Sequence, residues 1–204
     1  MTAAPTVSLR ADVKRMAERT ADLRSEAVSM FASATPAQWK WSPNAATWSM
    51  ALVVEHLNLS ARLGLPEIER ALDRLQADGS VSDSLPKYGL LERLFIRMLS
   101  PNPPFKVPVP PIYIPKMAAD PAAETGPEFL KTLDRTATCI HSANGLDLAK
   151  LRIPSPANEK MVFCVGVWLE GLVAHNEYHW MQVRALRDNP GFPKNSTSAE
   201  RSKT

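Results

Sequence analysis

The chain has 204 residues, of which 45% are hydrophobic and 22% are charged, a composition that predicts one globular domain with a sizeable core. Its formal net charge is only +3, and the basic and acidic residues are interspersed. Without a basic stripe that could follow phosphates, nucleic acid is not expected as a partner. The N-terminus lacks the apolar core of a signal peptide, and no stretch reaches the roughly 18 apolar residues that span a bilayer, so we expect a cytoplasmic protein without a membrane partner.

The first two predicted helices are separated by a turn-like connection. Apolar residues recur at spacings of three and four from Leu9 to Met30, which indicates a helix with one buried face. After the connection, Thr47 is the predicted N-cap of a second helix that ends near Gly79. Pro66 lies inside this second pattern, so the helix should kink or restart there. Three tryptophans crowd the connection and are expected to cap one end of the molecule: Trp39, Trp41 and Trp48.

A proline-rich segment follows the second helix. A short helix is predicted over residues 90–99, and the stretch from there to residue 124 is dense in proline. Proline at this density forbids a regular helix and favours extended backbone. The segment is therefore a long crossover, which allows the second and third long helices to point the same way.

Two further helices complete the expected fold. The third covers residues 127–144, and the fourth runs from Glu159 to Asp188, where an Asn-Pro-Gly sequence ends it. This order predicts an all-α four-helix bundle with the long crossover between its second and third helices. We expect one domain over residues 1–188 and a disordered tail over 189–204.

Two of the four histidines lie four residues apart in the apolar stretch "GLVAHNEYHWMQVRAL". At that spacing on a helix, the imidazoles of His175 and His179 lie one turn apart on the same face, so one helix can offer two nitrogens to one metal ion. Such a pair can also be two ordinary histidines at the rim of a helix. Here both share a stripe with Leu172 and Val183, which places them toward the core, where unpartnered imidazoles would cost free energy.

His56 is the candidate for a third ligand. It lies on the inward stripe of the second helix, nine residues after Thr47, while His175 and His179 lie thirteen and nine residues before Asp188. If the start of the second helix and the end of the fourth share one end of the bundle, all three imidazoles lie at about the same depth, since each residue adds about 1.5 Å of rise. The spacing therefore predicts a three-histidine metal site.

Three imidazoles without a fourth protein ligand are typical of a catalytic metal site, because the open position can hold water or substrate. Zinc, nickel, iron and copper all accept such ligands. Gln182 follows His179 by three positions and could orient a water from outside the ligand set, or it could be a solvated amide. Gly171 could leave space beside the metal or allow close helix packing. The cysteines, Cys139 and Cys164, fit no metal-binding spacing and are predicted to be buried thiols.

These residues resemble a known family. A tryptophan and serine at the start of the second helix, a histidine two turns later and an H-x-x-x-H with a following glutamine in the last helix are similar to the DinB-like superfamily of metal-binding four-helix bundles. The positions that carry the resemblance are Trp48, Ser49, His56, His175, His179 and Gln182. The resemblance spans residues 8 to 188. It implies an up-down-down-up bundle that binds a divalent metal and can form a homodimer.

The resemblance also gives alternatives for function. Characterised relatives include S-transferases and isomerases that use low-molecular-weight thiols, and others are thought to be hydrolases. We expect a divalent-metal-dependent enzyme that acts on a small molecule. Transfer of a thiol is the first hypothesis for its reaction, and hydrolysis by an activated water is the second. A non-enzymatic metal-binding or dimerising bundle is the third reading, because fold alone fixes no reaction.

Other polar residues receive smaller roles. Glu55 and Glu177 each neighbour a ligand histidine, but adjacent positions on a helix point about a hundred degrees apart, so both are assigned to the solvated face. Tyr113 and Lys116 in the crossover are minor candidates for the mouth of the site. His141 receives no role.

Overall fold

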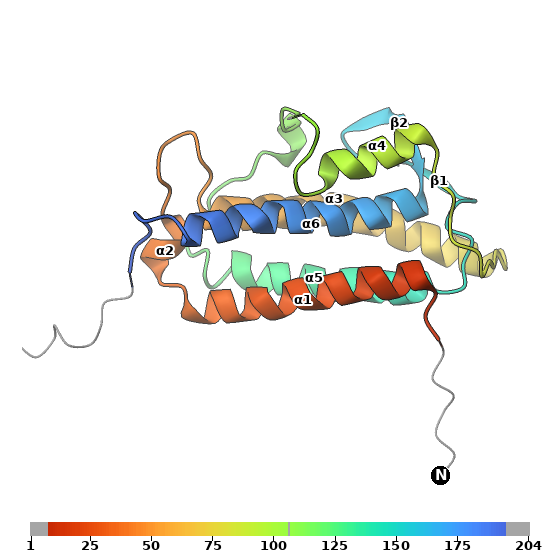
Figure 1. Ribbon diagram of the computed structural model, residues 1–204, viewed down its shortest axis with the longest axis horizontal. Coiled ribbons are helices and arrows are strands. Elements are labelled where there is room, and N and C mark those ends of the chain that lie inside the picture. The colour runs from red at the N-terminus through yellow and green to blue at the C-terminus, as the bar shows by residue number, and fades with distance from the viewer. Residues whose placement is uncertain (1–7, 106, 195–204) are drawn as a thin grey trace, which may run out of the picture.

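The structure is a computed structural model that describes residues 8–105 and 107–194. Four long helices lie side by side along its longest axis: α1 (Ala11–Ser33), α3 (Met50–Ala77), α5 (Thr125–Ser142) and α6 (Val165–Arg187). By the colour gradient of Figure 1, α1 and α6 run in one direction and α3 and α5 in the other. The helices α3 and α5 pack on each other, and α6 packs on α3. The mostly helical fold is therefore confirmed, and α3 continues through Pro66 as one helix.

The core lies between these four helices. One buried cluster includes Met16, Leu65 and Ile140, and a second includes Phe129 and Trp180. These side chains are at most 1% exposed, and burial of each is worth about 1.5–3 kcal/mol. The clusters hold α3 and α6 at a fixed separation, which matters because the predicted metal ligands come from these two helices.

Local capping sets the connection between α1 and α3. Ser49, rather than the predicted Thr47, caps α3, because its hydroxyl accepts a hydrogen bond from the backbone N–H of Leu52 at 3.4 Å. The connection also contains a short helix that the sequence reading treated as a turn, α2 (Pro36–Lys40). Thr35 and Gln38 form a reciprocal capping box with Pro36 at the first position, a signal that was visible in the sequence.

The start of the last long helix was predicted wrongly. Residues 159–164 belong to a hairpin of two antiparallel strands, β1 (Arg152–Ser155) and β2 (Asn158–Cys164), and α6 begins only at Val165. The fold is thus not entirely α-helical. The physical reason is local, since burial alternates along the end of β2, where valine, phenylalanine and cysteine favour extended backbone. The Ser-Pro-Ala-Asn sequence before it supplies the turn.

The crossover leads from the end of α3 back to the start of α5. Its first part contains α4 (Leu90–Leu99), as predicted, and its second part contains the 3₁₀ turn η1 (Pro111–Tyr113). Helix α4 packs on α6, where a Cβ at Gly171 would lie 3.2 Å from Leu99 Cδ1. Gly171 therefore allows close helix packing, and it also lines the cavity that the three histidines share, so the structure agrees with both of its predicted roles. Figure 1 shows α4 and η1 covering α3 and α6 on the side away from α1 and α5.

Residues 192 and 193, which fall within the predicted disordered tail, contact the connection between α1 and α3. Gln38 Nε2 donates a hydrogen bond to the carbonyl of Pro193 at 2.7 Å, and the Phe192 ring meets the Trp41 ring edge-on at a centroid distance of 5.4 Å. Residues 195–204 of the predicted tail lie outside the described residues. Among the helices that the structure describes, none combines the length and the apolar character needed to cross a membrane.

Two helical glycines give a test of the packing. A Cβ at Gly64 would meet nothing within 4 Å, whereas a Cβ at Gly166 would lie 2.6 Å from Tyr88 Oη and 3.0 Å from Leu148 Cβ. We expect Gly64→Ala to raise the free energy of unfolding by about 1 kcal/mol, because alanine is the better helix former. Gly166→Ala should lower it by about 1–3 kcal/mol through overpacking. Urea unfolding of both variants measures this, and an equal response of the two would contradict the packing described here.

Candidate metal centre

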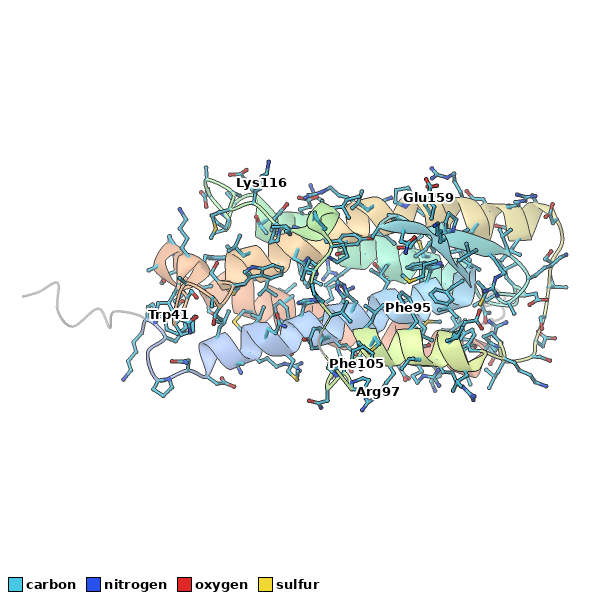
Figure 2. All side chains as sticks on the ribbon, turned by 90° about the horizontal axis from the view of Figure 1, so that it is seen from above. Trp41, Phe95, Arg97, Phe105, Lys116 and Glu159 are labelled. Carbon is cyan, nitrogen blue, oxygen red and sulfur yellow. The ribbon has the colours of Figure 1, made fainter. Side chains whose placement is uncertain are left out.

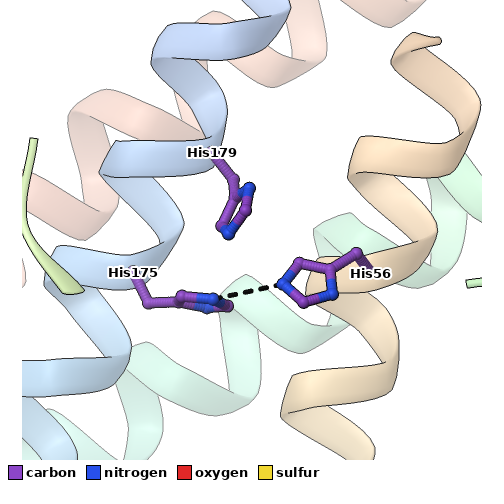
Figure 3. A group of neighbouring side chains, drawn as sticks. All are labelled: His56, His175 and His179. Carbon is purple, nitrogen blue, oxygen red and sulfur yellow. Dashed lines mark hydrogen bonds between the residues drawn. The ribbon is translucent and has the colours of Figure 1, made fainter. Parts of the chain in front are cut away.

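The three predicted ligands converge between two helices. His56 comes from the second turn of α3, and His175 and His179 come one turn apart from the middle of α6. One ring nitrogen of each lies within 4.8 Å of those of the other two, and Figure 3 shows the three rings facing one common point. The sequence prediction that these residues meet at one depth is therefore confirmed.

The hydrogen bond of His56 to the crossover fixes its protonation. Its Nδ1 lies 2.7 Å from the main-chain carbonyl oxygen of Tyr113. A carbonyl can only accept, so Nδ1 must carry the proton, and in the neutral ring Nε2 is then a free lone pair. That Nε2 is the nitrogen that faces the other two histidines, at 3.2 Å from His175 Nε2. The crossover thus orients His56 as a ligand.

Gln182 has the same effect on His179. Its Oε1 lies 3.1 Å from His179 Nδ1, one turn further along α6. This amide oxygen accepts a hydrogen bond from the protonated Nδ1 of His179. In the neutral ring, Nε2 of His179 then carries the free lone pair. Gln182 therefore contacts the ring of His179, a role that neither of its two predicted alternatives, orienting a water or being a solvated amide, includes. A partner of this kind fixes the orientation and the tautomer of a ligand ring.

The spacing of the nitrogens fits a bound ion. Two nitrogens held at roughly 2.0–2.1 Å from one tetrahedral zinc lie about 3.3 Å apart. The two Nε2 atoms of His56 and His175 lie 3.2 Å apart, a separation at which a proton or a cation must lie between them. The fixed lone pair on His56, the fixed lone pair on His179 and this separation together fit a divalent metal.

Burial keeps the imidazoles neutral. Burial lowers the pKa of His56, although the hydrogen bond to the Tyr113 carbonyl acts in the opposite direction and raises it. Burial also lowers the pKa of His179 to about 3, and the nearby His56 lowers it further. The pKa of His175 falls well below its ordinary value, because of burial first and of the two other histidines second. Since metals bind the neutral ring, all three are ready to act as ligands at neutral pH.

A large cavity opens beside the three histidines. It has a volume of about 940 Å³, within the usual range for small-molecule sites, and all three rings line it together with Gln182. Among the described residues, the cluster that could hold a metal contains no cysteine, aspartate or glutamate. The histidines would therefore leave at least one coordination position of a bound ion facing the cavity.

The neighbouring polar residues are engaged elsewhere. Glu55 pairs with Arg62, and Glu177 pairs with Arg19 of α1 at 2.6 Å, so neither carboxylate lines the cavity. Cys139 and Cys164 are buried free thiols, as predicted, and burial raises the pKa of Cys139 to about 11. His141, the fourth histidine, is exposed on α5.

Trp48 and Tyr113 both lie at the site. Trp48 was expected to cap the molecule, but it lines the cavity with its ring centroid 5.2 Å from that of His56. Tyr113, a minor candidate for the mouth of the site, does line the cavity, and it also contributes its main-chain carbonyl, which no side-chain pattern can reveal. Lys116, the other minor candidate, is exposed and lies outside the lining.

No family model, no curated protein and no solved structure matches this chain. The similarity to the DinB-like superfamily therefore depends on the sequence positions named above. The geometry of the three histidines stands independently of it, since it follows from the distances alone.

We expect the protein to bind one divalent ion per chain. His56→Ala and His179→Ala should each bring the bound ion close to zero, because two remaining imidazoles hold a metal weakly. Dialysis against zinc or nickel followed by elemental analysis measures the stoichiometry. The matched control is His141→Ala, which removes an exposed histidine, and equal losses in all three variants would contradict the site.

Removal of the Gln182 side chain should weaken metal binding without abolishing it. Gln182→Ala deletes the acceptor that orients His179, and loss of such a partner costs about 10–100-fold in metal affinity. Gln182→Glu keeps an oxygen at that position and should bind at least as well as the original protein. Competition with a chromophoric chelator gives both constants. Identical affinities for the alanine and glutamate variants would show that the amide plays no part.

Proposed function

We propose that this protein is a divalent-metal-dependent enzyme that transfers a thiol to a small electrophilic molecule. The proposal includes the resemblance stated above, with the four long helices as an up-down-down-up bundle of the DinB-like type that can form a homodimer. The observation that carries it is the exposure of a three-histidine cluster to a cavity of about 940 Å³. A purely structural metal is enclosed by four protein ligands, which speaks against the non-enzymatic reading.

The reaction joins a thiol to an electrophilic carbon. It forms a carbon–sulfur bond, breaks the bond from carbon to its leaving group, and releases the thiol proton. When bound, a divalent ion would lower the pKa of a coordinated thiol so that it reacts as the thiolate. His56, His175 and His179 would hold that ion, while the Tyr113 carbonyl and Gln182 orient the rings of His56 and His179.

The thiol must come from outside the chain. Neither cysteine lines the cavity, and burial raises the pKa of both thiols, so neither supplies a reactive thiolate. A low-molecular-weight thiol is therefore the expected second substrate.

Hydrolysis is the second candidate, with water in place of the thiol. The cavity is large enough to admit both water and an ester or amide. Among the described lining residues, however, no carboxylate or lysine is available as a general base. A thiol needs less help, since its ordinary pKa near 8.5 is far below that of water. We therefore rank thiol transfer first.

The cobalt-loaded protein should show a sulfur-to-cobalt charge-transfer band in the near ultraviolet when 2-mercaptoethanol is added. The matched control compound, 2-(methylthio)ethanol, has no S–H proton, cannot form a thiolate and should give no band. The zinc-loaded protein should consume 2-mercaptoethanol in the presence of 1-chloro-2,4-dinitrobenzene, a neutral electrophile, faster than His179→Ala does. Cleavage of 4-nitrophenyl acetate without any thiol consumption would instead favour hydrolysis.

A further inference from the structure

The cavity extends along α3 well beyond the three histidines. Residues four apart on one face of α3 line it, beginning with His56 and continuing through Ser60 and Gly64 to Ile68. Twelve residues of helix correspond to about 18 Å. Residues of α4, β2 and α6 line the same region, which we call the α4 arm and define by Gly64, Ile68, Phe95, Leu99, Met161 and Trp168.

The walls of the α4 arm are held by specific contacts. The Phe95 ring stacks on Phe163 of β2 at a centroid distance of 4.6 Å and meets Trp168 edge-on at 5.1 Å. Trp168 Nε1 in turn donates a hydrogen bond to the carbonyl of Ile153 in β1 at 3.0 Å. Figure 2 shows Phe95 lying over the body of the molecule and Arg97 of the same helix at its outer edge. Aromatic and aliphatic groups thus form the wall, and none of the charged residues of α4 (Glu92, Arg93 and Arg97) lines the cavity.

The described lining of the whole cavity contains no charged side chain. Aspartate, glutamate, lysine and arginine make up 22% of the chain, yet none is among the described residues that line it. Lys106 lies outside the described residues. The acidic residues of α6, Glu170 and Glu177, are instead paired with Arg19 of α1. A charged group in the α4 arm would lose its hydration without gaining an ionic partner.

Gly64 keeps the α4 arm open. It lies in the interior of α3, where glycine destabilises a helix relative to alanine. A Cβ there would meet nothing within 4 Å, so the space beside it belongs to the cavity and no packed side chain occupies it. A larger residue at this position would fill the α4 arm from the side of α3.

We propose that the substrate is a neutral, largely apolar molecule whose apolar part lies in the α4 arm while its reacting atom lies beside the three histidines. This inference rests on the proposed function for the reaction and on the lining of the cavity for the substrate class. It favours hydrocarbon or aromatic electrophiles over phosphorylated or carboxylated metabolites.

The test uses the full chain freed of metal by a chelator, so that a carboxylate cannot gain affinity through coordination. The neutral fluorophore N-phenyl-1-naphthylamine reports occupancy, and decanamide and decanoate compete for it. These two compounds share one chain length and differ in charge. We expect decanamide to bind at least about 10-fold more tightly than decanoate, because the α4 arm offers no partner for the carboxylate. Equal or tighter binding of decanoate would overturn the proposal.

Two variants locate the binding. Gly64→Leu should weaken decanamide binding by about 10-fold or more, with Gly64→Ala between it and the original protein. Met161→Trp narrows the same arm from β2 and serves if Gly64→Leu fails to fold, which thermal melting would reveal. The control is Arg70→Leu, which adds the same side chain to an exposed position of α3. Unchanged affinity in folded Gly64→Leu and Met161→Trp would refute the assignment.

These results remain distinguishable from failure of the proposed function. Metal is absent throughout, so selectivity for decanamide tests the substrate class alone. Loss of the cobalt–thiol band with retained decanamide selectivity would reject the reaction and keep the apolar site. The converse result would keep the reaction and reject the apolar substrate.

Discussion

The hydrogen bond between His56 and the Tyr113 carbonyl joins two parts of the molecule that are far apart in sequence. On one side is a rigid helix of the core, and on the other is the crossover that covers the cavity. Because the carbonyl accepts a hydrogen bond from Nδ1–H of His56, the backbone position of the crossover fixes which nitrogen of His56 faces the other two histidines. Metal binding and the shape of the cavity mouth therefore depend on the same contact.

Three imidazoles at one point are unfavourable unless each has a partner. Burial disfavours their charged forms, and their mutual proximity does so further, which the lowered pKa values reflect. The neutral rings still need hydrogen-bond partners, and Tyr113 and Gln182 supply one each. At the centre, the lone pairs of His56 and His179 face Nε2 of His175, which lies 3.2 Å from Nε2 of His56, so a proton or a cation must lie between these two nitrogens. A cation at this point would bind the lone pairs and would need little space. For this reason, metal binding explains the cluster better than a purely structural role of the histidines does.

Much of the fold and the ligand set could be predicted from the sequence because both depend on helical periodicity. The i,i+4 spacing of His175 and His179 places them on one face, and the distance of His56 from the start of its helix sets its depth. What failed were features without such periodicity. Residues 159–164 belong to a short strand whose alternation is brief beside the long helical pattern that follows, and the role of the Tyr113 carbonyl belongs to the backbone. The α4 arm arises from the way the short helix α4 packs on α6, which no local pattern determines.

Helix α6 has polar groups on two sides that serve different purposes. Toward α1 it presents Glu170 and Glu177, which share Arg19 and remain partly exposed, so that their contribution to stability is modest. Toward the cavity it presents His175 and His179 among apolar neighbours. Since the carboxylates are held on the α1 side, their negative charge does not reach the metal site as ligands or bases. A ligand set of three neutral imidazoles would leave the full charge of a divalent ion to act on a coordinated thiol, and this separation of charge along α6 would make an apolar cavity compatible with the metal chemistry that we propose.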